Sequence, residues 1–383
     1  MKSKKTNINI FYGPRKEFEK IIKSKRNKEN FTAIVQEHDE ETKAVHHIVE
    51  GQQVEPKKRN KRKITNLIIN SDEYSTITEG AIQNFTSILD YFEISNIYLQ
   101  NPPYIISEKL KKVYSKYIEN KYEYKTINLD IIKQINEHYS ENIIGQENSK
   151  IALLKSILSF EKFKKPKKLI VLMFYGPSGV GKTETAKFLS NILNEELFYK
   201  QFSMFQNNEF ATYLFGGLHS QNSFAKELLD RESNIIVLDE FDKANNYFYS
   251  AFYQLFDEGI FSDKNYSLKL DNGIIICTSN YNSQEEIRKH LGDPIYFRFD
   301  AFIPFEHLKE ESLIKIIDIY YNKYYNELSN SDKEIIDNYR NCKNESLIDV
   351  LHNSSKKLEN ARIINNIVKD CILQILLENE LNY

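Results

Sequence analysis

The pattern of hydrophobic and polar positions changes near residue 143. Beyond this point, short apolar runs alternate with stretches of helical spacing, which is typical of a parallel α/β sheet. Three runs, at 169–174, 235–238 and 274–277, are continuously apolar, as expected of central strands that are buried on both faces. From about residue 306 onward the apolar positions follow the helical period, which predicts a small helical domain.

The first 135 residues have a weaker pattern that predicts a small α/β domain. The predicted elements are a hairpin with strands at 31–35 and 44–49, a strand at 64–70, a helix at 79–92, a strand at 97–100 and a helix at 107–120. Ser107 is the expected N-cap of the last helix. We find no catalytic constellation and no internal repeat in this part of the chain, so its role stays open.

A glycine-rich segment directly follows the apolar run at 169–174 and leads into a helical stretch. Its residues are Gly176, Pro177, Ser178, Gly179, Val180, Gly181, Lys182 and Thr183. Between a strand and a helix, such a loop curls its backbone N–H groups round a phosphate, and the helix N-terminus adds partial positive charge. We therefore predict a site for ATP, with Lys182 on the β- and γ-phosphates and the Thr183 hydroxyl on Mg²⁺.

Two adjacent carboxylates, Asp239 and Glu240, end the apolar run at 235–238. A buried parallel strand delivers such residues to the carboxyl edge of the sheet, where ligands bind. Either acid alone is compatible with a helix cap or a salt bridge. Because the pair follows a phosphate-binding loop, we predict that Asp239 holds Mg²⁺ through water and that Glu240 orients and polarises the attacking water.

The third apolar run, at 274–277, ends in Thr278, Ser279 and Asn280. A polar residue after a strand is often a helix cap or a turn former. At this edge of the sheet, however, the Asn280 amide has a second option, a hydrogen bond to the γ-phosphate or to the attacking water. Both interpretations are kept open at this point.

Several further segments occur in the same order as in a known family. They are Ile-Ile-Gly-Gln at 143–146, the glycine-rich loop with its continuation at 184–187, Leu-Asp-Glu-Phe-Asp-Lys-Ala at 238–244, Phe-Asp-Glu-Gly-Ile-Phe-Ser-Asp at 256–263 and Thr-Ser-Asn at 278–280. Together they resemble the Clp/heat-shock branch of the AAA+ ATPases over residues 142–377. The resemblance implies a P-loop AAA+ core with a parallel sheet, followed by a helical lid.

The resemblance also implies roles for individual residues. Ile143, Ile144 and Glu184 join the glycine-rich loop as nucleotide-binding residues, and Asn280 becomes the first sensor. Arg298 lies in the segment that carries the arginine finger, which would reach the γ-phosphate of a neighbouring subunit; its alternative is an ion pair with a surface carboxylate such as Asp300. Arg362 matches the second sensor, although Asn360 replaces the family's glycine; the alternative is a solvated helix arginine.

Two departures from the family affect the expected activity. Unfoldases of this branch carry a glycine-aromatic-valine-glycine loop that grips a polypeptide, whereas residues 214–221 are Leu-Phe-Gly-Gly-Leu-His-Ser-Gln. Tyr213 or Phe215 could replace the aromatic residue, but packing is the simpler role for both. We also expect a lid without the short strand that follows the second sensor's helix in relatives.

Composition and charge restrict the remaining possibilities. The chain has 383 residues, with 41% hydrophobic and 28% charged residues, which is typical of a globular protein of two or three domains. Its longest apolar run and its N-terminus predict neither a membrane span nor a signal peptide, so we expect a cytoplasmic protein. Cys277, Cys342 and Cys371 are too widely spaced for a zinc site.

The net charge of −2 does not favour nucleic acid as a partner. A compact basic cluster at 57–63, with the sequence Lys-Lys-Arg-Asn-Lys-Arg-Lys, is compatible either with a nucleic-acid or acidic-partner patch or with a solvated linker.

We therefore expect three domains: an N-terminal α/β domain at 1–135, a large nucleotide-binding domain at 136–305 and a helical lid at 306–383. An arginine finger requires a partner subunit, so a ring is expected, with six subunits as the predicted number. The predicted function is an ATPase that remodels or disassembles a protein client. The alternatives are a nucleotide-gated switch in a defence or signalling assembly that threads nothing, and a nucleic-acid remodelling ATPase.

Overall fold

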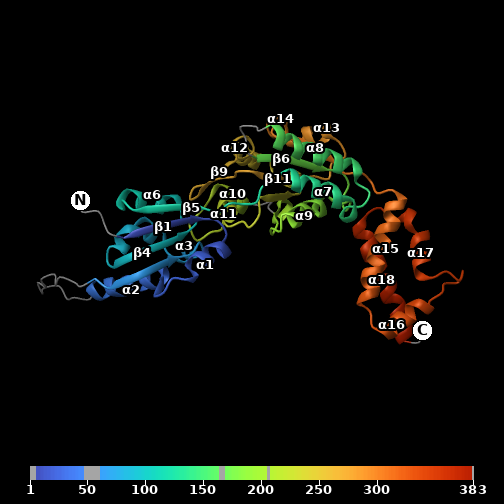
Figure 1. The fold of residues 1–383 in the computed structure, drawn as a ribbon, viewed down its shortest axis with the longest axis horizontal. Coiled ribbons are helices and arrows are strands. Elements are labelled where there is room, and N and C mark those ends of the chain that lie inside the picture. Colours follow the sequence, from blue (N-terminus) through green and yellow to red (C-terminus); the bar gives the residue numbers. More distant parts are fainter. Residues whose placement is uncertain (1–5, 47–60, 164–168, 205–207, 382–383) are drawn as a thin grey trace, which may run out of the picture. The chain divides into compact units, whose positions relative to one another are not determined.

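The computed structural model describes residues 6–46, 61–163, 169–204 and 208–381, which fold into two compact units. The first unit consists of Met1–Lys125, Phe205–Asn234 and Asn245–Asp271. The second consists of Thr126–Met204, Ile235–Ala244 and Asn272–Tyr383. Figure 1 labels the elements of both units.

The first unit contains a parallel sheet of five strands in the order β2-β3-β4-β1-β5. The strands are β1 (Asn7–Tyr12), β2 (Lys28–Asn30), β3 (Lys63–Ile69), β4 (Glu93–Gln100) and β5 (Tyr117–Lys121). The helices between them are α1 (Arg15–Lys23), α2 (Phe31–His46), α3 (Glu73–Thr76), α4 (Glu79–Gln83), α5 (Phe85–Leu89) and α6 (Tyr104–Val113). The expected small α/β fold is therefore present.

Two separate apolar clusters cover the two faces of this sheet. Helix α1 packs Phe18 and Ile22 against Phe11 of β1 and Tyr98 of β4. Helices α2 to α6 pack on the opposite face, where Ile8 and other alternate strand residues are buried. Successive side chains of a strand point to opposite faces, which explains this division.

Further segments of the first unit come from the middle of the chain. They form α10 (Asn208–Phe215), α11 (Phe224–Leu229), the 3₁₀ helix η3 (Asn246–Phe252), α12 (Tyr253–Glu258) and an antiparallel pair of β9 (Ile260–Ser262) and β10 (Ser267–Lys269). Backbone and side-chain hydrogen bonds connect these segments to the N-terminal sheet domain; for example, Tyr104 N donates to Asn265 O over 2.8 Å.

The second unit contains another parallel sheet of five strands, in the order β12-β6-β11-β8-β7. The strands are β6 (Leu169–Tyr175), β7 (Phe198–Gln201), β8 (Ile235–Asp239), β11 (Gly273–Thr278) and β12 (Ala301–Pro304). The three predicted apolar runs form β6, β8 and β11 and lie at the centre of the sheet. Their burial on both faces confirms the prediction from the sequence.

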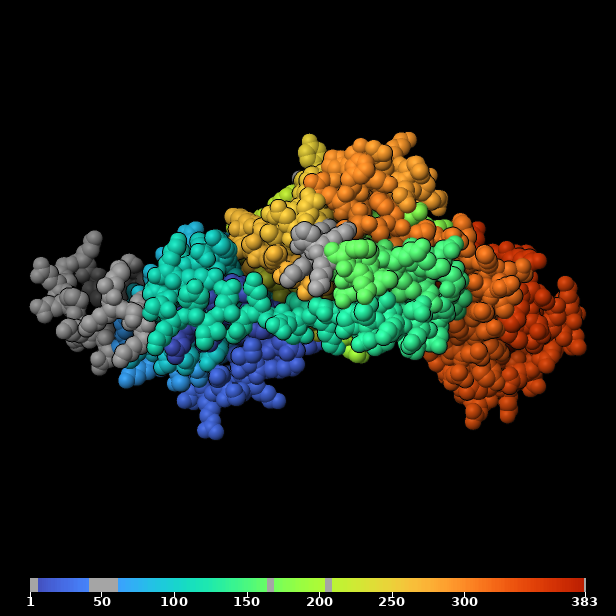
Figure 2. Space-filling model, turned by 45° about the horizontal axis from the view of Figure 1, so that its top comes forward, coloured from blue at the N-terminus to red at the C-terminus, as the bar shows by residue number. Residues whose placement is uncertain are grey.

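Helices and short 3₁₀ segments surround this second sheet. They are α7 (Leu129–Asn142), α8 (Glu147–Phe163), α9 (Lys182–Ile192), η1 (Phe202–Met204), η2 (Phe241–Lys243), α13 (Gln284–Leu291) and α14 (Asp293–Tyr296). Helices α7 and α8 pack against each other and form a continuous teal-to-green band on the surface in Figure 2. The turn between them carries the Ile-Ile-Gly-Gln segment at 143–146.

The C-terminal part of the second unit is helical, as predicted. Its helices are α15 (Glu310–Glu327), α16 (Asn330–Asn338), α17 (Leu347–Asn353), η4 (Ser355–Lys357) and α18 (Ala361–Glu380). Buried Ile317 of α15 and Val368 of α18 belong to the same apolar cluster as the strand residues Leu172 and Ile276. One continuous core therefore joins the lid to the sheet.

Three expectations for the N-terminal domain are wrong. Residues 31–35 begin helix α2 instead of a hairpin, because Asn30 Oδ1 accepts a hydrogen bond from Ala33 N over 3.3 Å and Glu73 Oε2 accepts one from Phe31 N over 2.7 Å. The expected helix at 79–92 is divided into α4 and α5. The expected helix at 107–120 is also wrong: α6 begins after Pro103, so Ser107 is no N-cap, and it ends at Val113, while residues 117–120 belong to strand β5.

No helix in the described parts of the chain combines the length and the apolar character that crossing a bilayer requires. The cytoplasmic location stays a prediction. Cys277 is buried and Cys342 is exposed, and all three cysteines are free thiols.

Candidate nucleotide site

A cleft of about 580 Å³ lies at the carboxyl edge of the second sheet. It brings together the glycine-rich loop, the ends of β8 and β11, the turn between α7 and α8, and the lid helices α15 and α18. The predicted site residues that line it are Ile143, Ile144, Ser178, Gly179, Val180, Gly181, Lys182, Thr183, Glu184, Asp239, Glu240, Asn280 and Arg362. Segments more than 200 residues apart in the sequence thus meet in one cavity.

The glycine-rich loop begins at a position where the structure tolerates only glycine. Gly176 has a φ of 131°, and a Cβ atom at this position would lie 2.0 Å from the backbone oxygen of Phe305. The loop ends at Gly181, which has a φ of 115° and precedes the first residue of α9, Lys182. The first turn of α9 therefore presents its unpaired N–H groups toward the loop, which is the geometry of an anion site.

The Lys182 ammonium is buried inside the loop. Nζ donates to Gly176 O over 2.6 Å, to Pro177 O over 2.8 Å and to Asn280 Oδ1 over 3.0 Å. Burial lowers the pKa of Lys182 to about 8, although the nearby Asp239 carboxylate acts in the opposite direction. An anion in the cleft would favour the charged ammonium, so the loop is suited to a phosphate.

The two predicted carboxylates lie at the end of β8 and are held by side chains of neighbouring strands. Asp239 accepts hydrogen bonds from the Thr278 hydroxyl at Oδ1 and from the Tyr199 hydroxyl at Oδ2, each over 2.5 Å. Glu240 Oε2 accepts one from Gln201 Nε2 over 3.0 Å. Hydrogen bonds to Ser203 and Gln201 lower the pKa of Glu240, so this carboxylate is ionised at neutral pH.

Thr278 connects the two acids. Its hydroxyl donates to Asp239 and accepts a hydrogen bond from Glu240 N over 2.9 Å. Glu240 has a φ of 51° and a ψ of 43°, a left-handed conformation that is uncommon for residues other than glycine. Thr278 therefore helps to hold a strained residue at the point where the predicted general base is needed.

Sequence reasoning missed Thr278, Tyr199 and Gln201 as parts of this site. Thr278 directly precedes Ser279 and Asn280, so its position at the end of a strand was visible in the sequence. Tyr199 and Gln201 were not detectable, because their place depends on the pairing of β7 with β8, in which Gln201 lies opposite Asp239.

The lid contributes Arg362 and closes the cleft over the loop. Asn360 Oδ1 accepts a hydrogen bond from Ile363 N over 3.0 Å, so Asn360 is the N-cap of α18. Ala361 N donates to Gly179 O over 3.1 Å. These bonds explain the asparagine where the family has glycine: it begins the helix that carries Arg362 and keeps the lid in contact with the phosphate-binding loop.

Part of the lining of the cleft is apolar. Ile143 and Ile144 lie there, together with Leu308, Ile316 and Tyr320, which sequence reasoning did not assign to the site. Such a surface is suited to the flat face of a nucleobase.

Gln146 fixes the turn that carries the two isoleucines, because its side chain donates to Val180 O and Glu306 O and accepts from Glu306 N.

Arg298 lies outside the cleft of its own chain. It follows α14, and its Nη1 donates to Pro294 O. The Asp300 carboxylate accepts a hydrogen bond from Val171 N over 2.8 Å and thus anchors β12 to β6. A role for Arg298 within its own chain's cleft is therefore not supported, while a role toward a neighbouring subunit stays a prediction.

The donor set agrees with Mg²⁺ bound together with a nucleotide. Among the described residues, no group of three or more His, Cys, Asp or Glu side chains is arranged to hold a metal ion. Mg²⁺ bound by one carboxylate and one hydroxyl takes its remaining ligands from phosphate oxygens and water. Thr183 and Asp239, which the sequence predicts as these two protein groups, both line the cleft.

Comparisons with known proteins agree with this geometry. A family described as "AAA domain (Cdc48 subfamily)" matches residues 167–330. The chaperone ClpB of Chlamydia caviae is 28% identical over 222 residues, which are 48% of this chain and 26% of that protein. ClpL of Staphylococcus aureus, described as an ATP-binding subunit of the Clp protease, is 25% identical over 217 residues, 50% of this chain and 31% of that protein.

A cryo-EM reconstruction of Hsp104 in its closed state, with ATPγS and FITC-casein, has a similar fold. The TM-score is 0.53 at 14% sequence identity, over 100% of this chain and 90% of the Hsp104 chain. The match to ClpB spans about a quarter of that protein's length. The comparisons therefore show a Clp-type AAA ATPase domain and its fold.

Proposed function

We propose, from the Clp-type AAA domain that this chain carries, that the chain hydrolyses ATP and uses the energy to remodel a protein partner. The observation that carries the proposal is the convergence of Lys182, Asp239, Glu240, Asn280 and Arg362 on one cleft. They come from four separate places in the chain, namely the start of α9, the end of β8, the end of β11 and the start of α18, and each has the chemistry that phosphoryl transfer requires at that place.

In this proposal the residues of the cleft have distinct tasks. Lys182 and the first turn of α9 bind the phosphates, and Thr183 and Asp239 hold Mg²⁺, which neutralises charge on the phosphates. Glu240 accepts a proton from the attacking water, for which its ionised state is suitable. Asn280, whose Oδ1 accepts a hydrogen bond from Lys182, is proposed to contact the γ-phosphate with its amide.

Arg298 is proposed to act on the site of a neighbouring subunit. A permanent cation near the γ-phosphate stabilises the negative charge that develops during transfer. A ring of subunits, with six as the predicted number, supplies such a neighbour to every site. Each cleft then depends on the next chain for full activity, and this dependence couples hydrolysis to the assembly.

The first unit favours remodelling without threading. The segment 214–221, which replaces the gripping loop of the unfoldases, is held by hydrogen bonds within this unit. His219 N donates to Glu79 Oε1 over 2.7 Å, Lys264 N donates to Phe215 O over 3.0 Å, and Asn265 Nδ2 donates to Gly217 O over 3.1 Å. A segment fixed in this way is poorly suited to move a polypeptide stepwise.

The two aromatic candidates in that segment differ in their surroundings. Tyr213 is buried, and its hydroxyl donates to Glu227. Phe215 is 46% exposed and lies next to Phe248. A nucleotide-gated switch, in which hydrolysis resets a complex, is the second candidate function, and the buried position of Tyr213 and the hydrogen bonds that hold segment 214–221 favour it.

The nucleic-acid alternative receives little support. Residues 57–60 of the basic cluster lie outside the described residues. Within the described remainder, Arg62 forms ion pairs with Glu29 over 2.8 Å and with Glu37 over 2.7 Å. Part of the positive charge of the cluster is thus compensated inside the domain.

Phosphate release by the purified full chain tests the proposal. We expect Glu240→Gln to retain ATP binding and to lose turnover by a factor of about 100 or more, because the general base is removed. Lys182→Ala should lose binding. Glu258→Gln, which makes the same change at an exposed position, is the matched control and should keep full turnover. Undiminished hydrolysis in Glu240→Gln would contradict the assignment.

Two further experiments separate the candidate functions. A tagged unfolded protein should be neither translocated nor able to stimulate turnover if nothing is threaded, whereas a specific folded partner captured by Glu240→Gln in ATP should stimulate it. By itself, the Arg298→Ala protein should lose turnover. In mixed rings with Lys182→Ala subunits, whose arginine finger is intact, it should regain part of this turnover. No gain in mixed rings would make Arg298 a structural residue.

A further inference from the structure

The two sheets of this protein have the same topology. Numbered by chain order within each sheet, the strands of both follow the spatial order fifth, first, fourth, third, second. All pairs in both sheets are parallel. At the level of the fold the chain therefore contains a repeat, in which β1 corresponds to β6, β3 to β8, β4 to β11 and β5 to β12.

A short sequence repeat marks the same correspondence. Phe-Tyr-Gly-Pro occurs at 11–14, at the end of β1, and again at 174–177, at the end of β6. Sequence analysis missed it, because four residues separated by more than 150 positions carry little weight without the fold.

The backbone hydrogen bonds around the two copies also agree. Asn101 N donates to Phe11 O over 2.9 Å, as Ser279 N donates to Phe174 O over 2.9 Å. On the other side, Tyr122 N donates to Tyr12 O over 2.8 Å, as Phe305 N donates to Tyr175 O over 2.7 Å. Each turn is thus held by residues that follow the fourth and the fifth strand of its own sheet.

The glycines of the two turns are under the same constraint. Gly13 has a φ of 153°, and a Cβ atom there would lie 2.5 Å from Tyr122 Cβ. Gly176 has a φ of 131°, and a Cβ atom there would lie 2.0 Å from the backbone oxygen of Phe305. The register of β5 and β12 makes Tyr122 and Phe305 equivalent, so the close approach that requires glycine is shared.

The first unit has nevertheless lost the phosphate-binding loop. Helix α1 begins at Arg15, two residues after Gly13, whereas α9 begins at Lys182, six residues after Gly176. The four residues that curl round a phosphate are absent from the turn. Without them, the backbone N–H groups that bind phosphate have no equivalent.

The other chemical groups are also replaced. In the two sheets, β3 pairs with β4 in the same register as β8 pairs with β11. The residues that follow β3, Asn70 and Ser71, therefore correspond to Asp239 and Glu240 of the second unit. The register of β1 with β4 places Pro102 at the position of Asn280. At these described positions of the first unit, none of the groups that Asp239, Glu240 and Asn280 supply in the second unit is present.

A carboxylate from within the unit lies at the amino end of α1. Asp230 follows α11, and its Oδ1 accepts hydrogen bonds from Arg15 N over 3.0 Å and from Gln100 Nε2 over 2.7 Å. Gln100 Nε2 also donates to Gly13 O over 3.1 Å. Because β1 pairs with β4 in the same register as β6 pairs with β11, Gln100 is the equivalent of Thr278. Asp230 therefore lies between α1 and the end of β4, where an intact site would hold phosphate.

We infer that the first unit is a P-loop-type nucleotide-binding fold that has lost its nucleotide site, and that Asp230 occupies the former phosphate position and ties the segment 208–234 to α1. The negative carboxylate at the helix N-terminus replaces the phosphate charge. Because Asp230 precedes β8 by five residues, the tie fixes the segment that leads directly to Asp239 and Glu240. The chain then binds one ATP, in the second unit.

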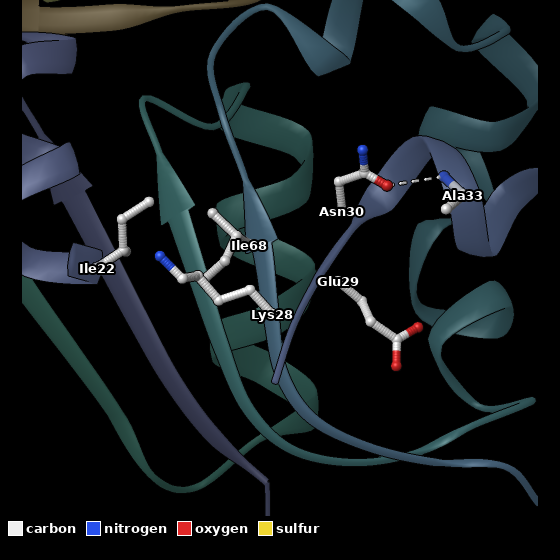
Figure 3. A pocket seen from close by; sticks show the side chains of 6 residues that line it. All are labelled: Ile22, Lys28, Glu29, Asn30, Ala33 and Ile68. Atoms are coloured by element: carbon white, nitrogen blue, oxygen red, sulfur yellow. Dashed lines mark hydrogen bonds between the residues drawn. The ribbon is translucent and has the colours of Figure 1, made fainter. Parts of the chain in front are cut away.

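Another hollow in the first unit lies elsewhere and does not change this inference. It has a volume of about 420 Å³ and is lined by Ile22, Lys28, Glu29, Asn30, Ala33 and Ile68. Figure 3 shows Lys28 extending toward Ile22 while Glu29 points away. The hollow lies at the edge strand β2, and neither the turn after β1 nor the first residue of α1 lines it.

Two measurements on the full chain test the inference. The first is equilibrium titration of the Glu240→Gln and Lys182→Ala variants with a fluorescent ATP analogue. One site per chain in Glu240→Gln, and none in Lys182→Ala, is the expected result. A site that persists in Lys182→Ala would place nucleotide in the first unit and overturn the inference, whereas loss of all binding in Glu240→Gln would instead contradict the proposed function.

The second measurement is hydrogen exchange near neutral pH. Asp230→Ala removes the acceptor of two hydrogen bonds, so we expect exchange at 15–18 and in 208–229 to accelerate about tenfold or more. Glu232→Ala is the control: Glu232 lies in the same segment and forms an ion pair with the exposed Lys16 side chain of α1 over 2.8 Å, so the change should alter exchange less than about twofold. Equal exchange in Asp230→Ala and the wild type refutes the tie, whatever the titration shows.

Discussion

Thr278→Val provides a direct test of how the two carboxylates are positioned. Valine has nearly the same shape as threonine, and the Thr278 side chain is buried, so the fold should persist. The change removes the hydrogen bond to Asp239 Oδ1 and leaves Glu240 N–H without its acceptor. Neither Lys182 nor the glycine-rich loop is touched, so the variant separates positioning of the acids from binding of the nucleotide.

The structure gives the expected magnitude. A hydrogen bond to a charged group contributes about 1.5–3 kcal/mol and a neutral one about 1 kcal/mol. Part of this energy keeps Glu240 in its left-handed conformation, which by itself costs about 1–3 kcal/mol. If about 1.5–3 kcal/mol of this stabilisation is lost in the transition state, kcat falls by a factor of about 10–160, since each 1.36 kcal/mol is tenfold.

The assay is steady-state phosphate release together with equilibrium binding of ATP. We expect kcat to fall while the Kd for ATP changes less than about threefold, and Thr278→Ser, which keeps the hydroxyl, to restore most of the activity. Thermal unfolding of both variants monitors the fold. Wild-type kcat in a folded Thr278→Val protein would refute the argument that this hydroxyl positions the acids, and equal loss in Thr278→Ser would assign the effect to packing.

Three other predictions follow from single contacts. Asn360→Ala should destabilise the second unit by about 1 kcal/mol, measured by denaturant unfolding, because α18 loses its N-cap; Asn360→Ser should recover most of it. Gly176→Ala should abolish ATP binding or folding of the second unit, because its Cβ would lie 2.0 Å from Phe305 O, and a normal Kd would contradict the geometry. Burial raises the pKa of Asp230 from 3.8 to about 6, so the folded state retains a proton that the unfolded chain releases. The stability of the first unit should therefore fall as the pH rises from about 4 to 6, and Asp230→Asn should remove this part of the dependence; an identical pH profile in the variant would show that Asp230 is not its source.

The N-terminal domain shows where local sequence patterns are insufficient. Residues 31–35 are rich in β-forming types, yet Phe31, Ile34 and Val35 have helical spacing and enter the core of the first unit. The decisive partner is Glu73, which lies 42 residues later and accepts a hydrogen bond from Phe31 N. Tertiary contacts of this kind override local preference because they satisfy the free N–H groups of a helix.

By itself, the sequence determined the elements whose signals are local. The continuously apolar runs, the glycine-rich loop and the pair Asp239–Glu240 need only neighbouring residues to be recognised, because burial of a central strand and the conformation of a phosphate-binding loop are encoded within a few positions. The fold class, the lid and the cleft followed from these signals.

Only the tertiary structure decided which distant residues meet. The roles of Thr278, Tyr199 and Gln201 depend on which strands are neighbours and in which register they pair. The equivalence of the two sheets and the position of Asp230, 215 residues from Arg15 in the sequence, have the same origin. Strand order and register are properties of the whole sheet, and no local stretch of sequence contains them.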